Sequence, residues 1–64
     1  MEIQAINELR KKRWYEKNGE YRLFLFRDVD GVFYYQTETD IKSKKITGTT
    51  DPSWWIGSRR AYRN

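Results

Sequence analysis

The residues of this chain that could take part in chemistry are cationic and aromatic side chains, and they occur in clusters. Residues 10–13 form an unbroken basic run followed at once by a tryptophan, and two further lysines stand together at positions 44 and 45. Near the C-terminus, two tryptophans precede a pair of arginines and a tyrosine. Cationic side chains pair with backbone phosphates, and flat rings stack on bases. The candidate binding residues are therefore Arg10, Lys11, Lys12, Arg13, Trp14, Lys44, Lys45, Trp54, Trp55, Arg59, Arg60 and Tyr62.

These clusters predict a small, basic, non-enzymatic module that binds nucleic acid, either DNA or RNA. The Arg and Lys side chains would contact phosphates, and the Trp and Tyr rings would stack on bases or insert into a groove. The chain carries 13 Lys and Arg residues against 9 Asp and Glu residues, a net charge of +4. That balance favours an anionic partner.

A protein partner is the main alternative, because Trp, Tyr and Arg are also favoured anchors of protein–protein interfaces. Four acidic residues, Asp28, Asp30, Glu38 and Asp40, are expected on the distal half of one hairpin, where they would repel phosphate. In this hypothesis the chain is a phage- or plasmid-type accessory protein that inhibits or regulates a host protein. The partner of its aromatic and arginine surface would be an acidic host protein.

The residue types argue against an enzyme. The 64 residues include no His and no Cys, which removes most nucleophile–base pairs, the commonest general base and the usual transition-metal ligands. Residues 28–31 look like the start of a calcium loop. With Gly31 as that loop's glycine, however, the first ligand would be Phe26 and the last Thr37. We expect no catalytic residue, no cofactor and no metal site.

Length and hydropathy predict one small domain over residues 1–64, in the cytoplasm. No window approaches the length of a membrane span or of a signal-peptide core, and the absence of Cys fits a reducing compartment. A chain of this size has little surface to bury. The three Trp, five Tyr and three Phe residues are therefore expected to supply most of the core.

The candidate residues must be positioned by a sheet built around residues 21–39. Asp30-Gly31 separates two apolar and aromatic runs there, which predicts a hairpin with a type I′ turn. This register would pair Phe26 with Tyr35 and Phe24 with Thr37. One face would then gather Phe24, Phe26, Phe33 and Tyr35. We expect that face to be covered by other elements, although an exposed stacking platform is the alternative.

Asn18-Gly19 suggests a second type I′ turn, which would pair Lys17 with Glu20 and Trp14 with Leu23. Residues 21–26 would then form a central strand, in agreement with their apolar side chains on both faces. The alternative is a helix that continues to Lys17 and ends at Asn18-Gly19.

Flanking segments complete the expected fold. Ile3, Ile6 and Leu9 predict a short N-terminal helix within residues 1–11, and residues 40–43 are expected to form a turn. Residues 44–49 would be a short edge strand, whose exposed edge would allow homodimerisation. Asp51-Pro52 should open a single helical turn through the two tryptophans, and residues 58–64 would be a last short strand or a basic arm.

The predicted fold class is therefore α+β and sheet-dominated. It has a small three- or four-stranded antiparallel meander over residues 12–49, a short N-terminal helix and a Trp-bearing C-terminal turn within residues 50–64. Such a small, basic, Cys-free chain is similar in architecture to archaeal chromatin proteins and to the arm-binding domains of some integrases. That similarity implies a fold, and no motif carries residue roles across.

Overall fold

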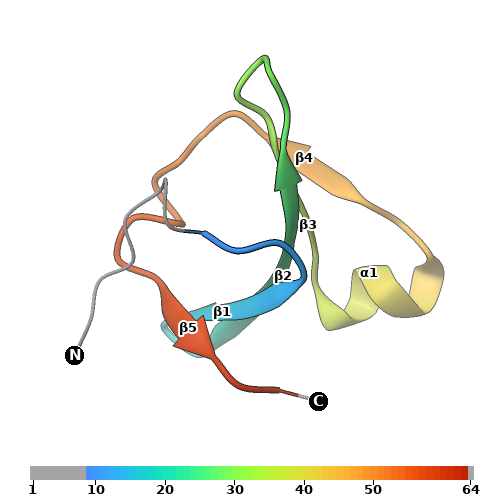
Figure 1. The fold of residues 1–64 in the computed structure, drawn as a ribbon. Coiled ribbons are helices and arrows are strands. Elements are labelled where there is room, and N and C mark those ends of the chain that lie inside the picture. The colour runs from blue at the N-terminus through green and yellow to red at the C-terminus, as the bar shows by residue number, and fades with distance from the viewer. Residues whose placement is uncertain (1–8, 64) are drawn as a thin grey trace.

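The computed structural model describes residues 9–63, and its centre is an antiparallel sheet with the strand order β4-β3-β2-β1-β5 (Figure 1). One short helix lies between β3 and β4 in this part of the chain. The elements are β1 (Arg13–Lys17), β2 (Glu20–Arg27), β3 (Phe33–Gln36), α1 (Glu38–Ser43), β4 (Thr47–Thr49) and β5 (Arg59–Ala61).

The hairpin at Asn18-Gly19 is confirmed. Asn18 has φ 53° and Gly19 has φ 81°, as a type I′ turn requires. The strands pair as expected, with Lys17 opposite Glu20 and Trp14 opposite Leu23. Residues 13–17 are therefore a strand and not the end of a helix, and β2 lies between β1 and β3 at the centre of the sheet.

The turn at Asp30-Gly31 differs from the prediction. Gly31 has φ 85°, but Asp30 does not share the positive φ that a type I′ turn needs. Instead, the Asp28 carboxylate accepts hydrogen bonds from the backbone N–H groups of Asp30 (2.9 Å) and Val32 (3.0 Å). This Asx-type turn makes the loop one residue longer than a two-residue turn, and Asp28 N–H donates to the Val32 carbonyl at 3.0 Å.

The longer loop and a shift between Phe24 and Phe26 change the register of β2 against β3. Phe24 lies opposite Tyr35, and Phe26 lies opposite Tyr34, so the predicted pairs Phe26–Tyr35 and Phe24–Thr37 are wrong. A register shift of this kind moves side chains to the other face of a sheet. Phe26 accordingly stacks on Tyr34, with ring centroids 4.8 Å apart, and is 41% exposed.

The helix is in the middle of the chain, so the prediction of an N-terminal helix as the fold's helical element is corrected. α1 occupies residues 38–43, of which 40–43 were expected to be a turn. Thr37 and Asp40 form a reciprocal capping box at its start, which satisfies backbone N–H groups that a helix end otherwise leaves free. Residues 1–8 lie outside the described part of the chain, and residues 9–12 are not helical.

The Trp-bearing turn covers one face of the sheet, as expected. Ser53 N–H donates to the Asp51 carboxylate at 2.9 Å, and Ile56 N–H donates to the Pro52 carbonyl at 3.1 Å. This turn delivers Trp55 into the core. The buried core residues are Tyr15, Phe24, Phe33 and Trp55, with Leu9, Tyr35 and Trp54 packed against them.

The C-terminal segment forms β5, which adds a fifth strand to the three or four predicted. It pairs with β1, so that Trp14 faces Ala61, Tyr15 faces Arg60 and Glu16 faces Arg59. Residues near the end of the chain therefore form the edge strand next to β1 (Figure 1). This pairing positions the candidate site.

Candidate nucleic-acid interface

Two backbone hydrogen bonds hold the basic segment at residues 10–13 against the sheet. Arg10 N–H donates to the hydroxyl of the buried Tyr15 at 2.8 Å, and Lys12 N–H donates to the Phe24 carbonyl at 2.7 Å. The four basic side chains of the segment are exposed. Their backbone is therefore fixed by the core while their charges face solvent.

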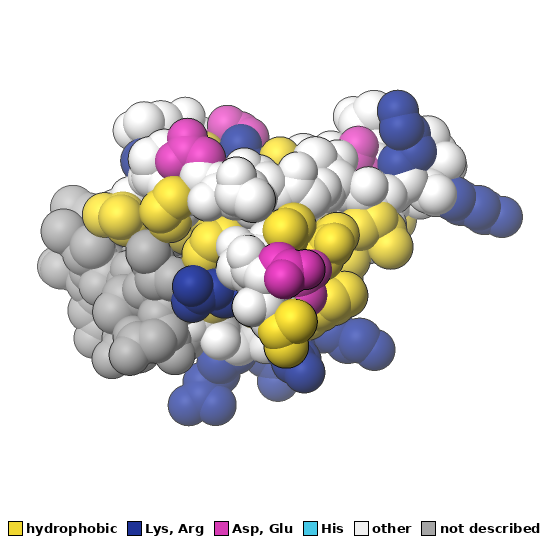
Figure 2. Space-filling view, turned by 90° about the horizontal axis from the view of Figure 1, so that it is seen from above, with side chains coloured by type: hydrophobic (Ala, Val, Ile, Leu, Met, Phe, Trp, Pro, Cys, Tyr) yellow, Lys and Arg dark blue, Asp and Glu magenta, His cyan; other side chains and the backbone are white. Residues whose placement is uncertain are grey.

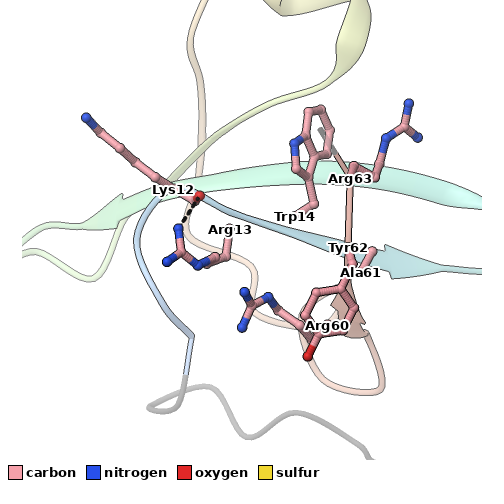
Figure 3. A pocket seen from close by; sticks show the side chains of 7 residues that line it. All are labelled: Lys12, Arg13, Trp14, Arg60, Ala61, Tyr62 and Arg63. Atoms are coloured by element: carbon pink, nitrogen blue, oxygen red, sulfur yellow. Dashed lines mark hydrogen bonds between the residues drawn. The ribbon is translucent and has the colours of Figure 1, made fainter.

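The β1–β5 pairing brings this segment together with the C-terminal cations. An open hollow of about 350 Å³ lies at this edge of the sheet (Figure 3). Four of its lining side chains are cationic, and none is a carboxylate. The hollow is lined by Lys12, Arg13, Trp14, Arg60, Ala61, Tyr62 and Arg63.

Strand alternation divides these side chains between two faces. Arg13 lies opposite Phe24 and Arg60 opposite Tyr15, both of which are core residues, so the two arginines share the core face of the sheet. Tyr62 is two residues beyond Arg60 and lies on the same side. Figure 3 shows the side chains of Arg13, Arg60 and Tyr62 extending in this direction, with Lys12 turned away. We call these three residues the edge cluster.

Within the edge cluster, part of the Arg60 guanidinium is buried, but neither arginine is neutralised by a carboxylate of the described residues. The guanidinium carbon of Arg60 lies 4.9 Å from the centroid of the Tyr62 ring, whose side chain is 85% exposed. The Nε of Arg60 is buried and has no hydrogen-bond partner in the described part of the chain. The Nη1 of Arg13 donates a hydrogen bond of 3.3 Å to the Lys12 carbonyl. Among residues 9–63, neither arginine has a carboxylate within ion-pair distance.

Trp14 and Arg63 lie on the other face of the same edge. The Arg63 guanidinium carbon is 5.1 Å from the Trp14 ring centroid and 4.4 Å from that of Tyr21, and Arg63 also pairs with Glu38. The predicted stacking residue Trp14 is thus partly covered by the chain's own arginine. Arg63 was not among the predicted site residues. The sequence feature that could have indicated Arg63 is its place as the third arginine of the basic C-terminal tail.

The other two tryptophans pack in or against the core. Trp55 has 0% exposure, so its ring has no face left for a ligand. Trp54 is half-buried, and the Arg22 guanidinium is stacked between the rings of Trp54 and Tyr35, 4.3 Å from each centroid. A small sheet with so few apolar residues needs these rings for packing, which explains why they are enclosed.

The remaining predicted cations do not join the edge cluster. Lys44 and Lys45 connect α1 to β4, at the opposite edge of the sheet. Arg59 lies on the face opposite to Arg60 and donates from Nε to the Glu16 carboxylate at 3.0 Å. The pKa of Glu16 is lowered by a hydrogen bond from Gly19 N–H and then by Arg59, so this acid remains charged beside Arg59.

The acidic residues occupy two separate places. Asp28 and Asp30 lie at the β2–β3 turn, where the charge of Asp28 raises the pKa of Tyr34. Glu38 and Asp40 lie in the first turn of α1, beyond the other end of β3. Figure 2 also shows the acidic side chains in separate groups. They therefore do not form the single acidic patch that was expected of the hairpin.

No helix in the described part of the chain is long and apolar enough to cross a membrane. Residues 9–63 contain no cluster of acidic side chains suited to holding a metal ion. Comparisons of the chain with models of known protein families, with curated proteins and with solved structures gave no match.

Proposed function

We propose that this protein is a non-enzymatic nucleic-acid-binding module that contacts its ligand with the β1–β5 edge of the sheet. One observation carries the proposal: β5 pairs with β1 and so places Arg60 and Tyr62 beside Lys12 and Arg13. Two clusters that are far apart in the sequence become one cationic surface.

The charge distribution at this edge suits a polyanion. Two of the lining cations, Lys12 and Arg13, are exposed, and no carboxylate lines the hollow to neutralise them. Phosphates that pair with such side chains release condensed counterions, which makes binding favourable and dependent on salt. Arginine can also hold a phosphate through two parallel hydrogen bonds, which a lysine cannot do.

A pair of double variants tests the proposal. Arg13→Gln with Arg60→Gln removes two charges from the edge cluster, whereas Lys42→Gln with Lys45→Gln removes two exposed charges from the far side of the sheet. Glutamine retains much of the apolar stem in both cases. In a fluorescence titration with a labelled oligonucleotide, we expect the edge variant to bind about tenfold more weakly or worse, because two charge-assisted contacts are lost.

The control variant should bind nearly as the unchanged protein does, since its charges lie farther from the ligand and are screened by salt. If both double variants weakened oligonucleotide binding equally, a local site would be contradicted, and the net charge of the protein alone would explain the binding. If no oligonucleotide binds and a stoichiometric protein is retained from nuclease-treated lysate, the protein-partner alternative replaces the proposal.

A further inference from the structure

We infer that the nucleic acid held by this edge is single-stranded, with one base stacked on Tyr62 and neighbouring phosphates paired with Arg13 and Arg60. The inference rests on the proposed function and specifies its ligand. It depends on the open ring of Tyr62, on the direction of the two arginines, and on the charges of the elements that project from the sheet.

The ring of Tyr62 is placed to receive a base. It is 85% exposed, more than any other aromatic side chain in the described part of the chain, and it makes no ring–ring contact there. The Arg60 guanidinium lies against it, 4.9 Å from the centroid. A base stacked on this ring would complete an arrangement of cation, ring and base, which is common in proteins that bind single strands.

The two arginines lie where the backbone of such a strand would pass. Arg13, Arg60 and Tyr62 extend to the same side of the sheet (Figure 3). A base on Tyr62 therefore brings its own phosphates to the guanidinium groups. In a single strand the flat faces of the bases are free to stack, whereas in a duplex they are already stacked on one another.

Two parts of the molecule that could enter a duplex groove, the β2–β3 turn and the start of α1, carry acidic side chains. The β2–β3 turn projects from the sheet (Figure 1) and bears Asp28 and Asp30. The helix α1 has six residues and bears Glu38 and Asp40 in its first turn and Lys42 in its last, and Glu38 is paired with Arg63. Carboxylates at these two places would be repelled by the phosphates that flank a groove. The cations lie instead along an open edge, which follows a single strand more readily than a groove.

Three ligands separate the contributions of charge and base: two single strands of equal phosphate number and one stable duplex. We choose an oligothymidylate of about ten nucleotides, an abasic strand of the same length and a short duplex, because single-strand sites span about 4–16 nucleotides. We expect the oligothymidylate to bind more tightly than the duplex. It should also bind about tenfold more tightly than the abasic strand, since stacking on one ring contributes roughly that factor.

Variants of Tyr62 then assign the base contact. Tyr62→Ala should remove the preference for oligothymidylate over the abasic strand, and Tyr62→Phe should keep it, because the phenyl ring still stacks. Ile56→Ala, another exposed apolar position at 51%, is the matched control and should change nothing. Circular dichroism confirms that each variant is folded.

The outcomes distinguish the inference from the function on which it rests. Salt-dependent binding that is stronger for the duplex, or a Tyr62→Ala variant that retains the base preference, would overturn the single-strand inference and leave the proposed function standing. The absence of salt-dependent binding to all three ligands would overturn both.

Discussion

The indole ring of Trp55 lies among five other rings, with centroid distances of 4.8 Å to Trp54, 5.5 Å to Phe24, 5.7 Å to Tyr35, 6.1 Å to Phe33 and 6.2 Å to Tyr15. Its exposure is 0%, and its Nε1 has no acceptor among the described residues. Edge-to-face contacts with the neighbouring rings are the main interactions left to it. At the scale of single residues, we expect this side chain to contribute the most to the stability of the fold, because it is the largest of the fully buried ones.

Trp55→Ala should destabilise the fold by about 3–5 kcal/mol, because it removes the largest buried side chain and leaves a cavity. A domain of this length has roughly 3–10 kcal/mol of stability in total, so the variant should lose about a third of it or more and should unfold at 25 °C if the total is near the low end. Trp55→Phe should cost less, since it keeps an aromatic ring and removes the unpaired N–H. Urea unfolding followed by circular dichroism measures both. Ile56→Ala, at the exposed neighbouring position, should change stability by less than about 0.5 kcal/mol.

Asp40 should make stability depend on pH. Hydrogen bonds lower its pKa from the ordinary value of 3.8, first from Thr37 N–H and then from the hydroxyls of Thr47 and Thr37. A pKa that is lower in the folded state stabilises the fold above the unfolded value, and this contribution is lost as pH falls through the folded value. We expect the melting temperature to fall below about pH 4, and to fall less steeply in Asp40→Asn.

Asp30→Asn is the control for this pH series, because the Asp30 carboxylate accepts no hydrogen bond within residues 9–63. It should retain the acid dependence of the unchanged protein. Identical pH profiles for Asp40→Asn and the unchanged protein would contradict a role for the capping carboxylate. The two other depressed carboxylates, Glu16 and Asp51, would then account for the acid dependence.

At the scale of the elements, α1 ends in a conformation that does not suit its residue. Lys44 has φ 59° and ψ 43°, the left-handed region that glycine adopts at little cost. Lys44→Gly should therefore stabilise the fold by about 1 kcal/mol. Thermal unfolding measures the gain, and Lys42→Gly, within the helix, should destabilise it by about the same amount. A loss of stability in Lys44→Gly would contradict the helix end described here.

The elements also show which sequence signals were reliable. Asn18-Gly19 predicted its hairpin and register, because both residues tolerate positive φ and the strands on each side alternate regularly. Asp30-Gly31 was misleading, since the Asp28 side chain competes for the backbone N–H groups and lengthens the loop. The short helix was missed, although Thr37 and Asp40 have the spacing of a capping box, because six residues carry too little periodicity to reveal a helix.

At the scale of the whole molecule, the sequence indicated the residue types of the site but not which of them meet. The basic run before β1 and the basic tail were both visible as clusters. Their juxtaposition depends on β5 pairing with β1 across most of the chain, and a three-residue strand gives no sequence signal for its partner. The position of each ring in the fold also determines its exposure. Tyr62 lies at the edge of the sheet and is exposed, whereas Trp55 lies in the turn over the core face and is buried.

The salt dependence of oligothymidylate binding is the sharpest test of phosphate contacts at the β1–β5 edge. For the unchanged protein, the logarithm of the association constant should fall linearly with the logarithm of salt concentration. Replacing Arg13 and Arg60 by Gln should make that slope shallower by about 1.4, because each phosphate contact on a single strand contributes about 0.7. The Lys42 and Lys45 double variant should keep the original slope. Equal slopes for the edge variant and the unchanged protein would contradict binding through the β1–β5 edge.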